Sequence, residues 1–279
     1  MKLKCIKFFR SGLLLLFMVF LALLVLFPIF WMFRSSFMTT YEMYNWPPKF
    51  IPSEWMFSNY LDALSRQPFA RYTINTLTIL VPVLAGTLVT ASLSAFAFSR
   101  LSFPGQKLWF GLVIGSMLMP YAITLIPIYL IWTKLRLVNT YWPLIIPSWL
   151  GGGAFNIFLM RQFMLTIPKE LDEAATIDGC GHMGILIKII VPLIKPVLVV
   201  VTIFTFLNVW NDFLGPLVYV NTTEKYTVAL ALALFKGEYK VDWGMLMAAC
   251  CTVAIPPMLV FLIGQRYIIE GITMTGLKA

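Results

Sequence analysis

Long apolar runs separated by short polar segments make up most of this chain of 279 residues. A helix needs about 20 apolar residues to cross a bilayer, and runs of that kind recur from one end of the chain to the other. The pattern predicts an all-α membrane protein with six transmembrane helices, at residues 12–33, 72–98, 108–131, 142–163, 192–214 and 243–263. An even number of crossings places both termini on one side of the membrane.

Two of the predicted helices contain breaks. Pro120 and Pro127 interrupt the third, and Pro147 and the glycines 151–153 interrupt the fourth. Non-helical backbone at membrane depth is tolerated only where it is buried in protein or lines a wet cavity. The breaks therefore indicate either a transport pathway or kinks packed against a neighbour. The second helix is instead rich in small and hydroxyl residues, which let helices approach closely, so we expect it inside the bundle.

Composition excludes a soluble domain. Hydrophobic residues make up 60% of the chain and charged residues only 12%, whereas about 25% charged is usual for soluble domains. A net charge of +9 could indicate nucleic acid in a soluble protein, but here a basic terminus precedes the first apolar run. That arrangement predicts an uncleaved membrane anchor whose basic end stays on the cytoplasmic side, as the positive-inside rule describes. We therefore expect the chain to contact lipid and not nucleic acid.

Loop composition completes the expected organisation. Residues 34–71 are rich in proline and aromatic residues and predict an external loop with short helices at best. Arg100 and Lys107 flank the turn after the second helix and predict a cytoplasmic side for it. We expect an anchor helix and external loop at 1–71, a transmembrane domain at 72–266 and a cytoplasmic tail at 267–279, in a bacterial-type plasma membrane.

The segment 167–192 is a polar interlude between two apolar runs. It holds four of the chain's twelve acidic residues within nine positions, Glu170, Asp172, Glu173 and Asp178. Pro168 suits a first helical position, anions are favoured in the first turn, and Gly179 and Gly181 would end the helix. The segment predicts two short helices joined at a glycine bend on the cytoplasmic face. Spacing alone fits an ordinary solvated loop equally well.

The spacing within this segment resembles the EAA motif of ABC-importer permeases. Glu173-Ala174-Ala175 is followed after three residues by Gly179, and after nine more by Ile189-Ile190-Val191-Pro192, where valine stands for the usual leucine. Residues 95–106, 137–147 and 210–217 resemble carbohydrate-uptake permeases of the maltose-transporter type. Residues 265–279 resemble the tail of that group's shorter permease.

The resemblance implies a permease subunit that pairs with a second, similar permease, two cytoplasmic ATP-binding subunits and an extracytoplasmic sugar-binding protein. The EAA loop, residues 167–192, would form a coupling helix that docks on the ATPase. The docking residues would be Glu173, Ala174, Ala175, Asp178 and Gly179. Two alanines on one helical face with Leu171 would let another surface come close. No GxxxxGK[ST] sequence occurs, so we expect no bound cofactor and no enzymatic activity, ATP being hydrolysed by the partner subunits.

A tentative solute pathway lies at the end of the fifth predicted helix. Asp212 is the clear ionisable residue within a predicted span, and Asn208, Trp210 and Asn211 add hydrogen-bonding groups and an aromatic face. A structural hydrogen bond to another helix is an equal alternative for Asp212. His182 beside Cys180 offers too few ligands for a metal site.

Three alternative functions compete with a sugar permease. The same machinery could import a polyol or a glycerol-phosphate-like solute. A stand-alone secondary transporter would show paired intramembrane charges and inverted repeats, neither of which is visible here. A membrane-embedded enzyme would need clustered His, Asp or Glu, and the chain has a single histidine.

Overall fold

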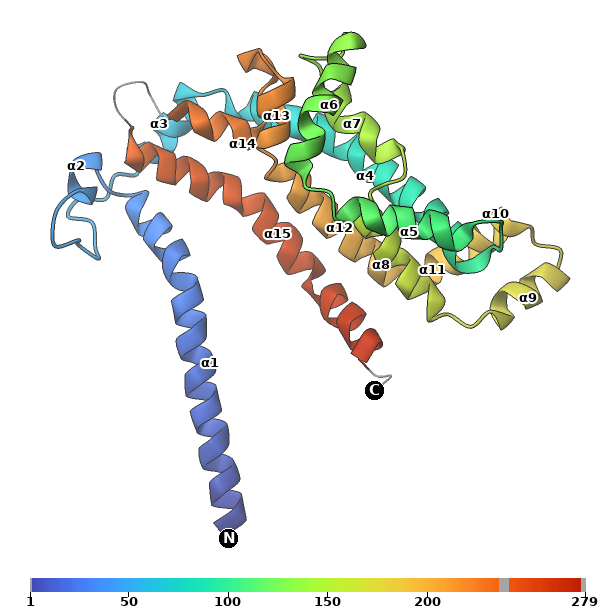
Figure 1. The fold of residues 1–279 in the computed structure, drawn as a ribbon. Helices are drawn as coiled ribbons and strands as arrows, with labels where there is room; N and C mark the ends of the chain where they lie inside the picture. The colour runs from blue at the N-terminus through green and yellow to red at the C-terminus, as the bar shows by residue number, and fades with distance from the viewer. Residues whose placement is uncertain (1, 236–240, 277–279) are drawn as a thin grey trace. The chain divides into compact units, whose positions relative to one another are not determined.

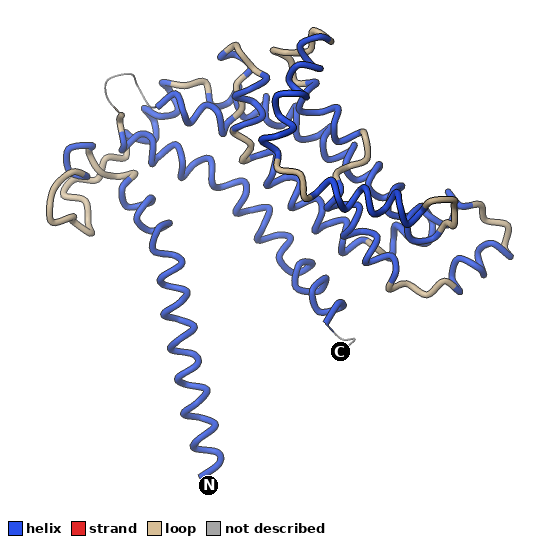
Figure 2. The backbone as a smooth tube through the Cα atoms, viewed as in Figure 1, coloured by secondary structure: helices blue, strands red, loops and turns tan. Residues whose placement is uncertain are grey.

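The computed structural model describes residues 2–235 and 241–276, which are helical with connecting loops and contain no β-strand (Figure 2). The predicted all-α class is therefore confirmed. The chain divides into two compact units, one made of Met1–Pro68 with Leu232–Ile255 and the other of Phe69–Ala231 with Pro256–Ala279.

The first unit contains the amino-terminal span and the segment that follows it. Its helices are α1 (Lys2–Ser35), α2 (Thr40–Met43), α3 (Ser58–Arg66), the 3₁₀ turn η3 (Leu232–Phe235) and the beginning of α15 (Trp243–Gly276). The Asn59 amide donates to the carbonyls of Ser36 (2.9 Å) and Met38 (3.0 Å), which folds the segment back on itself. The predicted loop with short helices is thus confirmed.

The second unit is a bundle organised around one long helix, α4 (Phe69–Arg100) (Figure 1). The other helices follow in chain order: α5 (Gln106–Met117), α6 (Tyr121–Lys134), α7 (Trp142–Trp149), α8 (Ala154–Leu165), α9 (Glu170–Ile177), α10 (His182–Ile185), the π-helical turn η1 (Leu186–Ile190), α11 (Val191–Leu193), α12 (Lys195–Trp210), α13 (Leu214–Tyr219), the 3₁₀ turn η2 (Thr223–Lys225), α14 (Val228–Ala231) and the end of α15.

Helix α4 lies inside the bundle, packed on α7, α8 and α12. Its small residues make this close packing possible. A Cβ added at Gly86 would lie 2.8 Å from the side chains of both Ser148 and Trp149, so the two helices touch where Gly86 has no side chain. The expected interior position of this helix is confirmed.

Four helical segments are long and apolar enough to span a membrane, and two bent helix pairs bring the number to six if each pair is one span. One pair is α5 and α6, which meet at 100° next to Pro120, whereas Pro127 lies inside α6 without a break. The other pair bends by 79° between residues 193 and 195, so helix precedes the predicted start at 192. The predicted end at 214 is also wrong, because α12 stops at Trp210.

Pro147 lies inside α7 without a break, and the break at 151–153 is packed against α4 at Gly152. Gly152 has φ +71° and lies directly against α4, where an added Cβ would be 2.7 Å from the Thr87 carbonyl oxygen. This favours the packed-kink interpretation of 151–153 over the pathway interpretation. Helix α15 continues past the predicted end of the sixth span to Gly276, so most of the predicted tail is helical.

Candidate functional site

The EAA loop begins with the short helix α9, which starts at Glu170. The Lys169 carbonyl accepts the first helical hydrogen bonds, from the backbone N–H groups of Asp172 (2.9 Å) and Glu173 (3.1 Å). The expectation that Pro168 takes the first helical position is wrong by two residues. The acidic first turn is as expected, and it places anions where the helix dipole is positive.

A Schellman motif ends α9. Gly179 has φ +81°, its N–H donates to the Thr176 carbonyl (3.0 Å), and the Cys180 N–H donates to the Ala175 carbonyl (2.9 Å). This pair of hydrogen bonds satisfies carbonyls that the helix end leaves open, and it needs the left-handed conformation that glycine adopts readily. The predicted stop at Gly179 is confirmed. Gly181 has φ −75° and precedes α10, so its predicted role as a second stop is wrong.

One face of α9 is packed against the rest of the unit and the other is exposed. Ala175 is 6% exposed and packs in a hydrophobic cluster with Ile185 and Ile190, so it does not share a free face with Ala174. The predicted face of paired alanines is therefore wrong. The exposed residues include four of the five predicted docking residues, Glu173, Ala174, Asp178 and Gly179. Ile177, which is 87% exposed, was missed because only the spacing of the motif directed attention to this helix.

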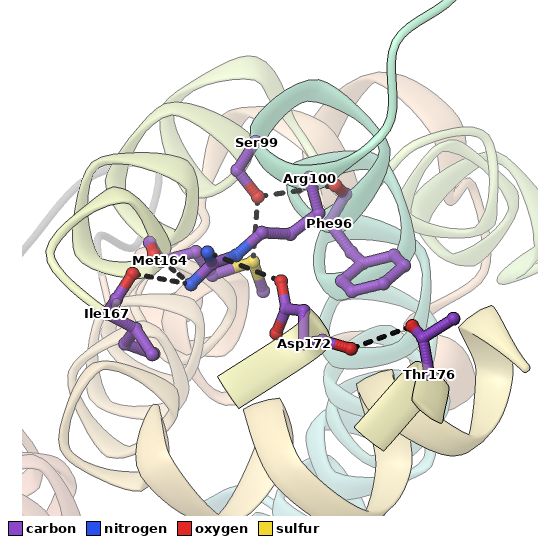
Figure 3. A network of polar contacts seen from close by, with 7 residues as sticks. All are labelled: Phe96, Ser99, Arg100, Met164, Ile167, Asp172 and Thr176. Atoms are coloured by element: carbon purple, nitrogen blue, oxygen red, sulfur yellow. Dashed lines mark hydrogen bonds and ion pairs between the residues drawn. The ribbon is translucent and has the colours of Figure 1, made fainter. Parts of the chain in front are cut away.

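Arg100, at the end of α4, fixes the loop from inside (Figure 3). Its guanidinium Nη2 donates to the carbonyls of Met164 (2.8 Å) and Ile167 (2.9 Å), and its Nη1 lies 3.3 Å from Asp172 Oδ2. The Arg100 side chain is 3% exposed. One buried cation thus holds both the carbonyl end of α8 and the first turn of α9. Asp172 is the acidic residue that turns inward, and its place in the acidic cluster did not distinguish it from Glu170, Glu173 and Asp178.

A second set of contacts holds the turn between α4 and α5. The Gln106 amide donates to the carbonyls of Phe98 (3.1 Å) and Leu101 (2.9 Å), and Arg161 Nε of α8 donates to the same Phe98 carbonyl (3.1 Å). The Arg161 guanidinium also lies over the Phe110 ring, 4.1 Å from its centroid. The ends of α4, α5 and α8 therefore form one rigid support behind the EAA loop.

The EAA loop stands at one end of this unit, with α9 beyond the ends of α5 and α8, whereas α6 and α13 lie at the opposite end (Figure 1). The four tentative pathway residues lie at the end of α12 (Lys195–Trp210) and in the turn before α13. Asn208 and Asn211 are exposed, three residues apart along the chain. Trp210 is 3% exposed and stacks on Phe206 with ring centroids 5.5 Å apart, so its ring faces the chain's own packing.

Asp212 lies in the turn between α12 and α13. Its Oδ1 accepts a hydrogen bond from the Gly215 N–H (2.9 Å). Gly215 belongs to α13, so this contact is a structural hydrogen bond to another helix, which was the equal alternative to a pathway role for Asp212. The pathway assignment of Asn208, Trp210, Asn211 and Asp212 stays a prediction.

Comparisons with known proteins agree with this architecture. The model of the family "Binding-protein-dependent transport system inner membrane component" matches residues 83–273. The chain is 35% identical over 204 residues to the arabinooligosaccharides transport system permease protein AraQ of Halalkalibacterium halodurans, covering 73% of this chain and 72% of that protein. It is 31% identical over 257 residues to the diacetylchitobiose uptake system permease protein DasC of Streptomyces coelicolor, covering 91% and 92%.

A solved structure shares the fold. A chain of a bacterial ABC transporter involved in the import of the acidic polysaccharide alginate superposes with a TM-score of 0.81 at 24% identity, covering 94% of this chain and 96% of that one. The family match covers most of the present chain, and the resemblance carried by the EAA motif is confirmed. The chain therefore belongs to the family of binding-protein-dependent transport system inner membrane components, and it is a permease subunit of an ABC transporter and not an enzyme.

Proposed function

We propose that this permease lines the pathway of an ABC importer for a sugar, together with a second, similar permease. The relatives AraQ and DasC are named for the uptake of arabinooligosaccharides and diacetylchitobiose, which supports a carbohydrate as the solute. Two ATP-binding subunits hydrolyse ATP, this chain binds no cofactor, and an extracytoplasmic binding protein delivers the sugar.

The EAA loop docks on the ATP-binding subunits. The observation that carries this assignment is the build of α9, a short helix closed by Gly179 and fixed from inside by Arg100. Its free face presents Glu173, Ala174 and Ile177. A helix fixed in this way can pass on a push, whereas a loop without such contacts would absorb it.

The docking role fixes the proposed topology. The EAA loop and the turn between α4 and α5 face the cytoplasm, and six crossings place both termini there too. The chain is then a multi-pass protein of the inner membrane. Asn208 and Asn211, which are exposed within this chain, line the pathway beside Asp212.

Charge reversal on the free face of α9 tests the docking assignment. We expect Glu173→Lys to insert normally but to lose co-purification with co-expressed ATP-binding subunits, because it places a cation on the docking face. Gly179→Asp removes the left-handed residue of the Schellman motif and should have the same effect. Glu54→Lys is the matched control, since it reverses an exposed acidic residue in the other unit.

The outcome is read from the amount of ATP-binding subunit recovered per permease and from uptake of a panel of labelled oligosaccharides by cells. Wild-type recovery with both α9 variants would refute the docking role. Uptake of none of the oligosaccharides by a complex that assembles and hydrolyses ATP would refute the sugar assignment alone.

A further inference from the structure

Helix α4 makes polar contacts to a different loop at each of its ends. At its carboxyl end, Arg100 holds the EAA loop through Met164, Ile167 and Asp172. At its amino end, Asn75 and Thr76 hold the segment 222–228, which contains η2 and the start of α14. Both loops and the helix belong to the same compact unit.

At the amino end of α4, the side chains of Asn75 and Thr76 form hydrogen bonds with backbone groups of the segment 222–228. The Asn75 amide Nδ2 donates to the carbonyls of Glu224 (2.8 Å) and Tyr226 (2.9 Å). The Thr76 hydroxyl accepts a hydrogen bond from the Val228 N–H (3.0 Å), and Thr76 and Val228 are both almost fully buried. Three backbone groups of the 222–228 segment are therefore tied to one turn of α4.

The helix between these two ends is continuous from Phe69 to Arg100, although Pro82 within it cannot donate a backbone hydrogen bond. Asn75 and Arg100 lie about 38 Å apart along the axis at 1.5 Å per residue. Packing holds the middle of the helix in place: the Thr90 hydroxyl donates to the Ser148 carbonyl (2.9 Å), and Gly152 touches the α4 backbone at Thr87. Close-packed interiors have low compressibility and transmit a displacement from one end to the other.

We propose that α4 is a connecting rod that transmits the position of the EAA loop to the segment 222–228, with Arg100 and Asn75 as the positioning residues at its two ends. The proposal rests on the docking role given above for the EAA loop. In that setting ATP-driven displacement of α9 pulls on Asp172, and the segment at the far end of α4 moves with the helix.

The contact at the EAA end is suited to sensing displacement. Arg100 and Asp172 meet through one nitrogen–oxygen contact, while Arg100 Nε and Asp172 Oδ1 are buried and find no hydrogen-bond partner among the residues that the structure describes. Arginine and a carboxylate can also pair through two parallel hydrogen bonds. A small displacement of α9 would therefore strengthen or weaken the ion pair between Arg100 and Asp172. This change would alter the force that α9 exerts on α4.

Hydrogen–deuterium exchange of the assembled transporter tests the proposal without knowledge of the sugar. The complex with its ATP-binding subunits is compared without nucleotide and with Mg·ATP plus orthovanadate. In the wild type we expect the exchange rate of the peptide containing Val228 to change by about 2- to 30-fold, the range that coupling energies of about 0.5–2 kcal/mol produce. Asp172→Asn and Asn75→Ala should each abolish the change while the ATP-binding subunits remain bound.

Two control variants isolate the effect. Thr176→Ala removes a hydroxyl that bonds only the Asp172 carbonyl within α9, and Thr78→Ala removes one that bonds Ile74 within α4, so both should keep the change. Asn75→Gln, which keeps the amide, should restore part of the response that Asn75→Ala loses. Asp172→Asn changes only the contact at the carboxyl end of α4 and leaves the hydrogen bonds to the segment 222–228 intact. A response at Val228 that is lost in this variant therefore reports transmission along the helix.

Persistence of the nucleotide-dependent change in either Asp172→Asn or Asn75→Ala would overturn the proposal. It would also be overturned if a wild-type complex that hydrolyses ATP showed no change at Val228. Failure of the wild-type chain to bind ATP-binding subunits at all would instead refute the docking role.

Discussion

The carboxylate of Asp212 accepts a hydrogen bond from the Gly215 N–H at 2.9 Å, and this contact closes the turn between α12 and α13. Gly215 is buried, and an added Cβ would meet the Asp212 carboxylate and the Leu144 side chain. The two residues are therefore matched: the aspartate supplies the acceptor and the glycine supplies the space.

Substitution of Asp212 separates its hydrogen bond from its charge. Asp212→Asn keeps an oxygen acceptor, so we expect a melting temperature near that of the wild type in detergent. Asp212→Ala removes the acceptor at the start of α13, which costs about 1 kcal/mol and should lower the melting temperature by about 2–4 °C. Equal destabilisation by both variants would contradict this role. A loss of uptake in Asp212→Asn at unchanged stability would assign the carboxylate to the pathway.

The contact between Gly152 and α4 predicts a strong effect of one methyl group. Gly152→Ala would place its Cβ 2.7 Å from the Thr87 carbonyl oxygen at φ +71°, so we expect it to destabilise the protein by about 1–3 kcal/mol. Gly111→Ala is the control, because nothing lies within 4 Å of the position in α5 and alanine favours helix. Thermal unfolding in detergent measures both, and similar midpoints would refute the packed-kink interpretation.

Arginine at position 100 should not be replaceable by lysine. A single ammonium group lacks the planar fork that reaches Met164, Ile167 and Asp172 together. Arg100→Lys should weaken the EAA loop by about 1.5–3 kcal/mol, the value of a hydrogen bond to a charged group. Limited proteolysis within residues 166–182 should then be faster than in the wild type. Arg71→Lys, at an exposed position of the same helix, should leave the digestion unchanged.

The carboxyl of Glu42, in α2 of the first unit, should make the stability of the segment around Ser53 depend on pH. Burial alone would raise the pKa of its carboxyl, but hydrogen bonds from the Ser53 hydroxyl and N–H (2.8 Å from the N–H), with the charges of Lys49 and Arg34, lower the pKa below its ordinary value of 4.5. A lowered pKa means that this stabilisation is present above about pH 4.5 and is lost as the pH falls through the lower, folded-state value.

Exchange of backbone amides in the peptide around Ser53 should therefore accelerate on acidification below about pH 4.5, after correction for the intrinsic rate. Glu42→Gln has no carboxylate to protonate, so its exchange should be faster than wild type at neutral pH and should not accelerate further. The same acid-induced step in Glu42→Gln would contradict the assignment.

The sequence by itself determined the class of the protein, the rough positions of its spans and the EAA loop. These features depend on local chemistry: an apolar run long enough for a bilayer, acidic residues in a first helical turn, and a glycine where a helix must end. Each signal lies within a few dozen neighbouring residues, so it can be recognised without knowing what packs against it.

Only the tertiary structure decided which side of each element is free. Helical spacing placed Ala174 and Ala175 together, but the cluster around Ile190 buries one of them and leaves Ile177 outermost in its place. Arg100 and Asp172 meet although they lie far apart in the sequence. The physical reason is that periodicity defines the angles between side chains on one helix, whereas burial and ion pairing depend on which other helix occupies each of those directions.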